Sequence, residues 1–253
     1  MKKTIFTLSL SILVFTLIIS SCKKSDNPTS SGSSTTSNST TTGNGNPSGT
    51  FNGILYYGYE VNGSISMYIG AADFFNSPVA FNPSTQAVAT ATVNSISLNS
   101  TQLPYNSSSN NYSSFTTTSL GFPPAAWIVN GAGIIPSFTY TNTNPMPTFT
   151  GLSSFPSSVS KSQNLVIPIT GASGCDQIQV QVNDSTNKTT SVYVAGGATS
   201  VTILKDSLTK LNNCLSGSIS ISLIKYNQQT LSGKSFLFGT IYITGKNNVV
   251  LKQ

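Results

Sequence analysis

The sequence predicts an all-β protein, and three observations support this fold class. Only 7% of the residues are charged, whereas soluble domains average about 25%. Ser, Thr, Asn and 20 Gly residues are abundant, and these residues are poor helix formers. From Phe51 onward, short apolar–polar alternations recur between clusters of Gly, Asn and Pro, which is the pattern of half-buried strands. We expect two β-rich domains and at most one short helix, preceded by a signal helix and a disordered linker.

The beginning of the chain predicts export and lipid attachment. Two lysines precede an apolar run from Ile5 to Ile19, and two serines follow before Cys22. These features are typical of a secretory signal peptide, here residues 1–21. The junction resembles a bacterial lipobox, in which the cysteine is lipidated and becomes the first residue of the mature protein. The alternative is a transmembrane helix, but the run is shorter than the roughly 20 apolar residues that a bilayer requires. We therefore expect Cys22 to carry lipid, palmitate included, and to hold the protein on a membrane.

The predicted linker comprises the lipidated cysteine and the segment after it, residues 22–50. It consists almost entirely of Ser, Thr, Asn, Gly and Lys. Such a segment buries too little apolar surface to offset its chain entropy, so it is expected to be disordered. The linker would then act as a flexible tether between the membrane and the folded part of the chain.

The first predicted domain covers residues 51–144. Two strands, Phe51–Val61 and Ser64–Phe75, flank Asn62-Gly63, a strong signal for a two-residue hairpin turn. Asn-Ser tracts such as Asn106–Asn110 are expected to form turns. The further predicted strands are Ala87–Val93, Ser95–Leu98, Asn111–Thr116, Ala125–Asn130 and Ser137–Thr141. The stretch Asn142–Pro147 contains two prolines and is the predicted domain boundary.

The second predicted domain covers residues 145–253 and is expected to be an Ig-like β-sandwich. About seven short alternating strands over roughly 100 residues are typical of that architecture. The segment Asp206–Leu211 predicts one helical turn, because an acidic start precedes leucines at i and i+3. The predicted strands are Leu165–Ile169, Ile178–Val182, Ser191–Val194, Val201–Leu204, Ile219–Tyr226, Ser235–Thr244 and Val249–Leu251.

The three cysteines divide into one lipidation candidate and one pair. With Cys22 assigned to lipid, Cys175 and Cys214 remain in an oxidising compartment, which favours a disulfide between them. The alternative is two separately buried thiols, because free cysteine is commonly buried. Two cysteines without any histidine make a poor metal site.

The composition removes most catalytic chemistries. The chain has no histidine, so Ser-His-Asp and Cys-His catalysis and histidine-ligated zinc are excluded. A Ser-Lys pair stays open in principle. If Val61 faces Ser64 in the first hairpin, Glu60 and Asp73 lie about 26 Å apart, much further than the roughly 5 to 9.5 Å between glycosidase carboxylates. Glu60 is then a solvated strand residue. We expect no catalytic site and no cofactor.

The sequence favours neither a Ca²⁺ site nor a nucleic-acid interface. Asn183–Asn187 offers oxygen ligands for Ca²⁺, but one carboxylate is too few for this cation, so a plain turn is favoured and no metal is expected. The 12 basic residues are all lysines scattered along the chain, whereas nucleic-acid binding requires clustered basic residues. We therefore expect no nucleic-acid partner.

Tyrosines of the first hairpin are the candidate ligand-binding residues. Tyr56, Tyr57, Tyr59 and Tyr68 crowd this part of the chain. Tyr57 and Tyr59 share one strand face, and Tyr56 lies on the other. Such rings stack on sugars or fill interfaces, but sandwich cores also require aromatic residues, and packing is the favoured explanation.

The chain resembles a group of uncharacterised Bacteroidota lipoproteins. The resemblance rests on the lipobox, the Ser/Thr/Asn-rich linker and the passage from Trp127 to Gly171, together with Asp176-Gln177-Ile178 at the start of a strand. It implies all-β domains and an envelope location, and it provides no activity. Asp184-Ser185-Thr186 and Asp206-Ser207-Leu208 also resemble the O-glycosylation sites of that phylum, which makes Ser185 and Ser207 candidate acceptors.

Two functional hypotheses follow. The first is a non-catalytic lipoprotein anchored in the outer membrane, with a structural, adhesive or binding role and an envelope protein or a glycan as its partner. The second is a surface lipoprotein that binds carbohydrate through the four tyrosines and assists glycan capture. Neither hypothesis makes the protein an enzyme.

Overall fold

The computed structural model describes residues 45–253 except 64 and 84–86, and it confirms the all-β class. Within this part of the chain the helical elements are one α-helical turn, α1 (Lys205–Leu208), and one 3-10 turn, η1 (Gly151–Ser154). All other regular elements are strands. The signal peptide, Cys22 and most of the predicted linker lie outside the described residues.

One large sheet forms the framework of the molecule. Its strand order is β14-β13-β16-β17-β1-β2-β6-β5, and β10 also pairs with β17. Neighbouring strands are antiparallel except that β1 and β10 run parallel to β17. The strands are β1 (Thr50–Asn62), β2 (Ile65–Ala80), β5 (Tyr105–Asn106), β6 (Asn111–Thr116), β10 (Ser158–Ser160), β13 (Gln177–Asn183), β14 (Thr189–Ala195), β16 (Cys214–Leu231) and β17 (Lys234–Lys252).

Three smaller sheets accompany the large one. The first is a four-stranded sheet of order β4-β3-β7-β8, and the other two are the pairs β11-β15 and β12-β9. Their strands are β3 (Ser95–Leu98), β4 (Thr101–Gln102), β7 (Ala125–Asn130), β8 (Phe138–Asn142), β9 (Thr148–Phe149), β11 (Leu165–Pro168), β12 (Ala172–Ser173) and β15 (Ser200–Ile203).

The first core lies between the four-stranded sheet and β1, β2 and the beginning of β17. Trp127 of β7 is fully buried in it. Alternate residues of each strand point to the same face, which brings Phe236 and Phe238 of β17 beside Leu55 of β1. Two facing sheets with aromatic side chains between them make this half of the molecule a β-sandwich.

The second core is aliphatic and lies over the other half of the large sheet. Ile178 and Val180 of β13 and Ile219 and Ile221 of β16 are fully buried there. They pack against side chains of β15 and α1, including the buried Leu208. The predicted helical turn near residue 206 is confirmed, because its leucine faces this core.

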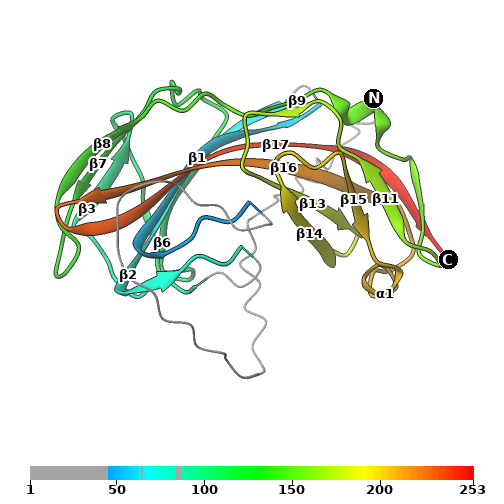
Figure 1. Cartoon of the computed structure of the whole chain (residues 1–253), viewed down its shortest axis with the longest axis horizontal. Helices are drawn as coiled ribbons and strands as arrows, with labels where there is room; N and C mark the ends of the chain where they lie inside the picture. Colours follow the sequence, from blue (N-terminus) through cyan, green and yellow to red (C-terminus); the bar gives the residue numbers. More distant parts are fainter. Residues whose placement is uncertain (1–44, 64, 84–86) are drawn as a thin grey trace, which may run out of the picture. The chain divides into compact units, whose positions relative to one another are not determined.

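A single hairpin, β16–β17, belongs to both cores. Its strands are 18 and 19 residues long, about 60 Å when extended, whereas a typical strand has about 5–6 residues. Phe236 and Phe238 enter the first core, and Val249 and Leu251 enter the second. In Figure 1 this orange-to-red hairpin runs from the β3–β7–β8 sheet to β11, β15 and α1.

The large sheet therefore crosses the predicted domain boundary. The segment between residues 142 and 147 does separate β8, which packs on the first core, from β9, which precedes the second. However, β1 pairs in parallel with β17 from Gly53 to Val61, and all described residues belong to one compact unit. The structure has two cores on one continuous sheet, and the first core includes Phe236 and Phe238 from beyond the predicted boundary.

Several local predictions differ from the structure. The predicted strand Ala87–Val93 is wrong, because this segment makes only an isolated bridge between Ala91 and Phe74. Residues 45–50, assigned to the linker, include the buried Gly45 and Pro47 beside β13. Gly45 lies so close to the Asp176 carbonyl that an added Cβ atom would collide with it. The folded part therefore begins before Phe51, where the sequence predicted its start.

The first hairpin is confirmed, but its register is shifted by two residues. The last paired residues before the turn are Asn62 and Ile65, whereas the predicted last pair was Val61 and Ser64. Gly63 adopts the left-handed conformation, with φ 64°, which glycine tolerates without steric cost. Glu60 pairs with Met67 and Asp73 pairs with Ile54, so the two carboxylates lie six residues apart along the sheet, about 20 Å. At this distance Glu60 and Asp73 are too far apart to act together as glycosidase carboxylates.

Replacement of Gly58 tests the junction between β1 and β17. A Cβ atom at this position would collide with the Ile241 carbonyl, so Gly58→Ala should destabilise the fold by about 1–3 kcal/mol, the usual cost of overpacking. The matched control is Gly197→Ala, where an added Cβ meets nothing within 4 Å. Urea unfolding of both variants measures the effect, and equal midpoints for the two would contradict the close β1–β17 approach.

Candidate functional site

The four candidate tyrosines do not form one binding surface. Tyr57 is 0% exposed in the first core, its ring contacts Phe122 at 5.0 Å, and its hydroxyl donates to the Asn144 carbonyl at 3.1 Å. Tyr56 lies on the opposite face and packs its ring on Gly239. Burial, and then the charge of Asp73, raise the pKa of Tyr56 well above its usual value. Both rings are structural.

The other two tyrosines belong to a row of rings across three strands. Tyr59 pairs with Tyr68 on β2 and with Tyr242 on β17, and the ring centroids lie 6.0 and 5.2 Å away. Tyr68 also contacts Phe122 at 5.8 Å. All three tyrosines are half-buried, and burial raises the pKa of Tyr59. Cross-strand packing, the favoured interpretation, explains these rings.

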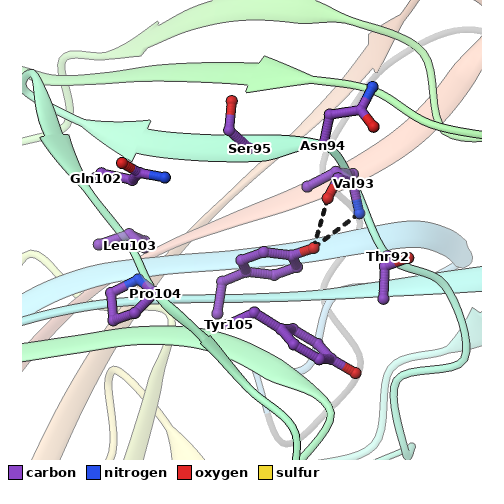
Figure 2. A pocket seen from close by; sticks show the side chains of 9 residues that line it. Thr92, Val93, Asn94, Ser95, Gln102, Leu103, Pro104 and Tyr105 are labelled. Atoms are coloured by element: carbon purple, nitrogen blue, oxygen red, sulfur yellow. Dashed lines mark hydrogen bonds between the residues drawn. The ribbon is translucent and has the colours of Figure 1, made fainter.

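A groove that the sequence did not reveal lies beside the first core. Its volume is about 400 Å³, within the range of small-ligand sites. Figure 2 shows residues 92–95 and residues 102–105 on its opposite sides. It is lined by Thr92, Val93, Asn94, Ser95, Gln102, Leu103, Pro104, Tyr105 and Tyr112.

Two tyrosines in contact give the groove a rigid aromatic wall. Tyr105 and Tyr112 face each other across the β5–β6 pair, with ring centroids 5.1 Å apart. The Tyr112 hydroxyl donates to the Val93 carbonyl at 2.7 Å and accepts from the Val93 amide at 2.9 Å. The Tyr105 hydroxyl donates to Asn110 Oδ1 at 3.1 Å. Tyr105 is nevertheless 43% exposed, so a fixed ring is accessible to a ligand.

The polar groups of the groove are neutral. Asn94 donates its side-chain amide to the Gly131 carbonyl at 2.7 Å, and Ser95 accepts from Asn130 at 2.6 Å. Both bonds hold the rim in place. The side chains of Thr92 and Gln102 are exposed, and neither bonds to another described residue. Among the described residues that line the groove, the tyrosine phenols are the only titratable side chains.

The groove could not be predicted from the sequence, and the reason is physical. Tyr105 belongs to the two-residue strand β5, which is too short to produce an alternating pattern. The only local signal was the turn around Asn106–Asn110, which the structure confirms through bonds from Ser108 to Asn106. A tyrosine before that turn and another after it could have indicated a cross-strand ring pair.

The predicted disulfide between Cys175 and Cys214 is wrong, because both thiols are free. Cys175 precedes β13, whose first residue, Gln177, pairs with Ile224 of β16. Cys214 begins the same strand β16, and ten residues of extended chain, about 30 Å, separate it from Ile224. A disulfide requires Cα atoms within about 7 Å. The alternative of two separate, partly buried thiols is the correct one.

The Asn183–Asn187 segment is a turn held by one carboxylate. Asp184 Oδ1 accepts from the Thr186 amide at 2.7 Å, the Thr186 hydroxyl at 2.8 Å and the Lys188 amide at 3.1 Å. Its Oδ2 accepts from the Asn212 amide at 2.7 Å. Burial alone would raise the pKa of Asp184, but these hydrogen bonds outweigh it and lower the pKa. Both oxygens thus face hydrogen-bond donors.

The two candidate glycosylation residues occupy different positions. Ser185 is exposed at the tip of the β13–β14 turn, next to Asp184. Ser207 lies within α1, where its amide donates to the Leu204 carbonyl at 3.0 Å, and it is half-buried. Their modification remains a prediction.

Some of the remaining charged groups have structural partners. Asp176 pairs with Lys225 at 2.7 Å, and the buried Lys161 donates to the Leu211 carbonyl at 2.7 Å. Burial raises the pKa of Glu60. In the part of the chain that the structure describes, no three His, Cys, Asp or Glu side chains gather as a metal site would require.

Comparison with known proteins does not extend these observations. No protein-family model matches the chain, and no curated protein matches it in sequence. Over residues 45–253, leaving out 64 and 84–86, no helix is long and apolar enough to span a bilayer. The resemblance to Bacteroidota lipoproteins thus stays a prediction.

Thiol counting tests the cysteine assignment. The chain unfolded in urea without reductant should release reactive thiols from both Cys175 and Cys214, and each Cys→Ser variant should remove one. In the folded protein Cys175 should react slowly, because burial, and then the charge of Asp176, raise its pKa to about 11 and so deplete the thiolate. Thiols that appear only after reduction would contradict the free pair.

The Asp184 turn predicts a pH-dependent stability. Because its folded pKa is lowered, Asp184 stabilises the protein above its unfolded pKa of about 3.9, and this contribution is lost as pH falls through the folded value. Asp184→Asn should cost about 2 kcal/mol near pH 7, since hydrogen bonds to a charged group are lost. The cost should shrink below about pH 4. The free energy of unfolding of both proteins, measured near pH 7 and below about pH 4, gives this cost. An equal cost at both pH values would contradict stabilisation by the ionised Asp184 carboxylate.

Proposed function

We propose that this protein is a non-catalytic, lipid-anchored protein of the cell envelope with a binding role. The lipobox-like junction at Cys22 supports the anchor, and the segment of Ser, Thr, Asn and Gly after it supports a tether. The lipid would hold the protein in the outer membrane, while the β-sheet body meets a partner.

The groove beside Tyr105 is the observation that supports binding best. General acid–base catalysis requires a titratable group, tuned near the working pH, within hydrogen-bond reach of the reacting atoms. The groove offers an aromatic ring, amides and hydroxyls instead. Binding sites typically combine an apolar surface with a few convergent polar groups. These features favour recognition of a ligand without its conversion.

The position of the tether is compatible with an accessible groove. The chain enters the body beside β13, where Asn46 accepts a hydrogen bond from the Gln177 side chain. Four strands, β16, β17, β1 and β2, lie between β13 and β6 in the sheet order. None of the groove residues belongs to the entering segment, residues 45–50. The beginning of the described chain and the groove therefore lie on different strands of the sheet.

Carbohydrate capture is the second candidate function. On the sequence it depended on the four first-hairpin tyrosines, of which Tyr57 is fully buried and Tyr56 lies on the other face. The exposed, fixed ring of Tyr105 favours this function more than those tyrosines do. Capture of a glycan would also suit a body attached to the envelope by a tether.

The anchor is tested by lipid labelling. Cells that express the wild-type protein and are fed radioactive palmitate should label it and retain it in the membrane fraction. Cys22→Ala should lose both the label and the membrane association, because lipid chains supply the anchoring free energy. Cys214→Ser, which removes a cysteine of the folded body, is the matched control and should stay labelled. An unlabelled wild-type protein would disprove the anchor.

A further inference from the structure

We propose that the groove beside Tyr105 binds a neutral saccharide, which stacks one sugar ring on Tyr105 and hydrogen-bonds to Gln102 and Thr92. This inference deepens the proposed binding role by assigning a ligand class to the groove. It rests on the geometry of residues 92–105 and Tyr112, and it does not depend on the lipid anchor.

The exposed ring of Tyr105 matches the apolar face of a pyranose. A pyranose presents several C–H groups on one face, and an aromatic ring carries partial negative charge on its face. Tyr105 is held on one side by Tyr112 and at its hydroxyl by Asn110. The ring is thus ordered before a ligand arrives, which reduces the entropy cost of binding.

The polar side chains of the groove match the hydroxyl rim of the same sugar. Gln102 supplies two donors and an acceptor, and Thr92 supplies one hydroxyl that both donates and accepts. Neither side chain bonds to another described residue, so both are available. Figure 2 places Thr92 and Gln102 on opposite sides of the groove, with the Tyr105 ring at its lower end. A sugar on the ring would therefore have polar groups at more than one edge.

The lining disfavours the other common ligand classes. Anionic ligands such as phosphates are bound by Arg, Lys or helix N-termini, and none of these occurs among the described residues that line the groove. Divalent cations require carboxylate oxygens, and the lining residues that the structure describes supply none. A purely apolar ligand would leave the rim amides without partners, which costs free energy. A neutral polyhydroxylated molecule satisfies both the ring and the amides.

Calorimetric titration of the full-length protein in detergent tests the site. The probes are neutral hexasaccharides of glucose, xylose, mannose and N-acetylglucosamine. At least one should bind the wild-type protein. Tyr105→Ala should raise its Kd about tenfold, because the stacking platform is lost. Tyr105→Phe keeps the ring and should stay within about twofold of wild type. Phe115→Ala, an exposed ring on the opposite face of β6, is the matched control and should bind normally.

Gln102→Ala provides a second variant that leaves the aromatic wall intact. Its side chain is exposed, so the thermal midpoint should not change while the Kd rises several-fold. If no hexasaccharide binds the wild-type protein, the saccharide assignment is overturned, and the palmitate result for Cys22 is unaffected. If a hexasaccharide binds wild type and Tyr105→Ala equally, the groove is not the binding site. Both results differ from failure of the anchor, which only labelling detects.

Discussion

The structure depends on one hairpin, β16–β17, that is long enough to serve two cores. Its Phe236 and Phe238 pack under the four-stranded sheet, while Val249 and Leu251 pack under β11, β15 and α1. Both cores thus contain side chains from this hairpin. Because the parallel pairing with β1 adds a further shared contact, the two halves should share their stability instead of folding as separate domains.

The groove lies where strands of two sheets come together beside the first core. Residues 92–95 lead into β3 of the four-stranded sheet, whereas Tyr105 and Tyr112 belong to β5 and β6 at the edge of the large sheet. The hydrogen bonds between the Tyr112 hydroxyl and the Val93 backbone join β6 to the segment before β3.

Much of the fold followed from side-chain alternation and turn residues. These features predicted the all-β class, the first hairpin and the helical turn near residue 206. They did not predict the parallel partnership of β1 and β17, because alternation determines which face a residue occupies and not which strand lies beside it. The disulfide error has the same origin, since only the register of β13 on β16 reveals how far Cys175 lies from Cys214. Tyr105 was missed because β5 has only two residues.

Urea unfolding followed by two local probes tests the shared hairpin most directly. Trp127 is the only tryptophan and lies in the first core, so its fluorescence reports that half. Cys175 and Cys214 both pack against the second core, so pulsed alkylation of their thiols reports the other. A hairpin common to both cores predicts coincident midpoints, as in two-state unfolding. Two well-separated midpoints, with one core intact while the other is unfolded, would contradict this account.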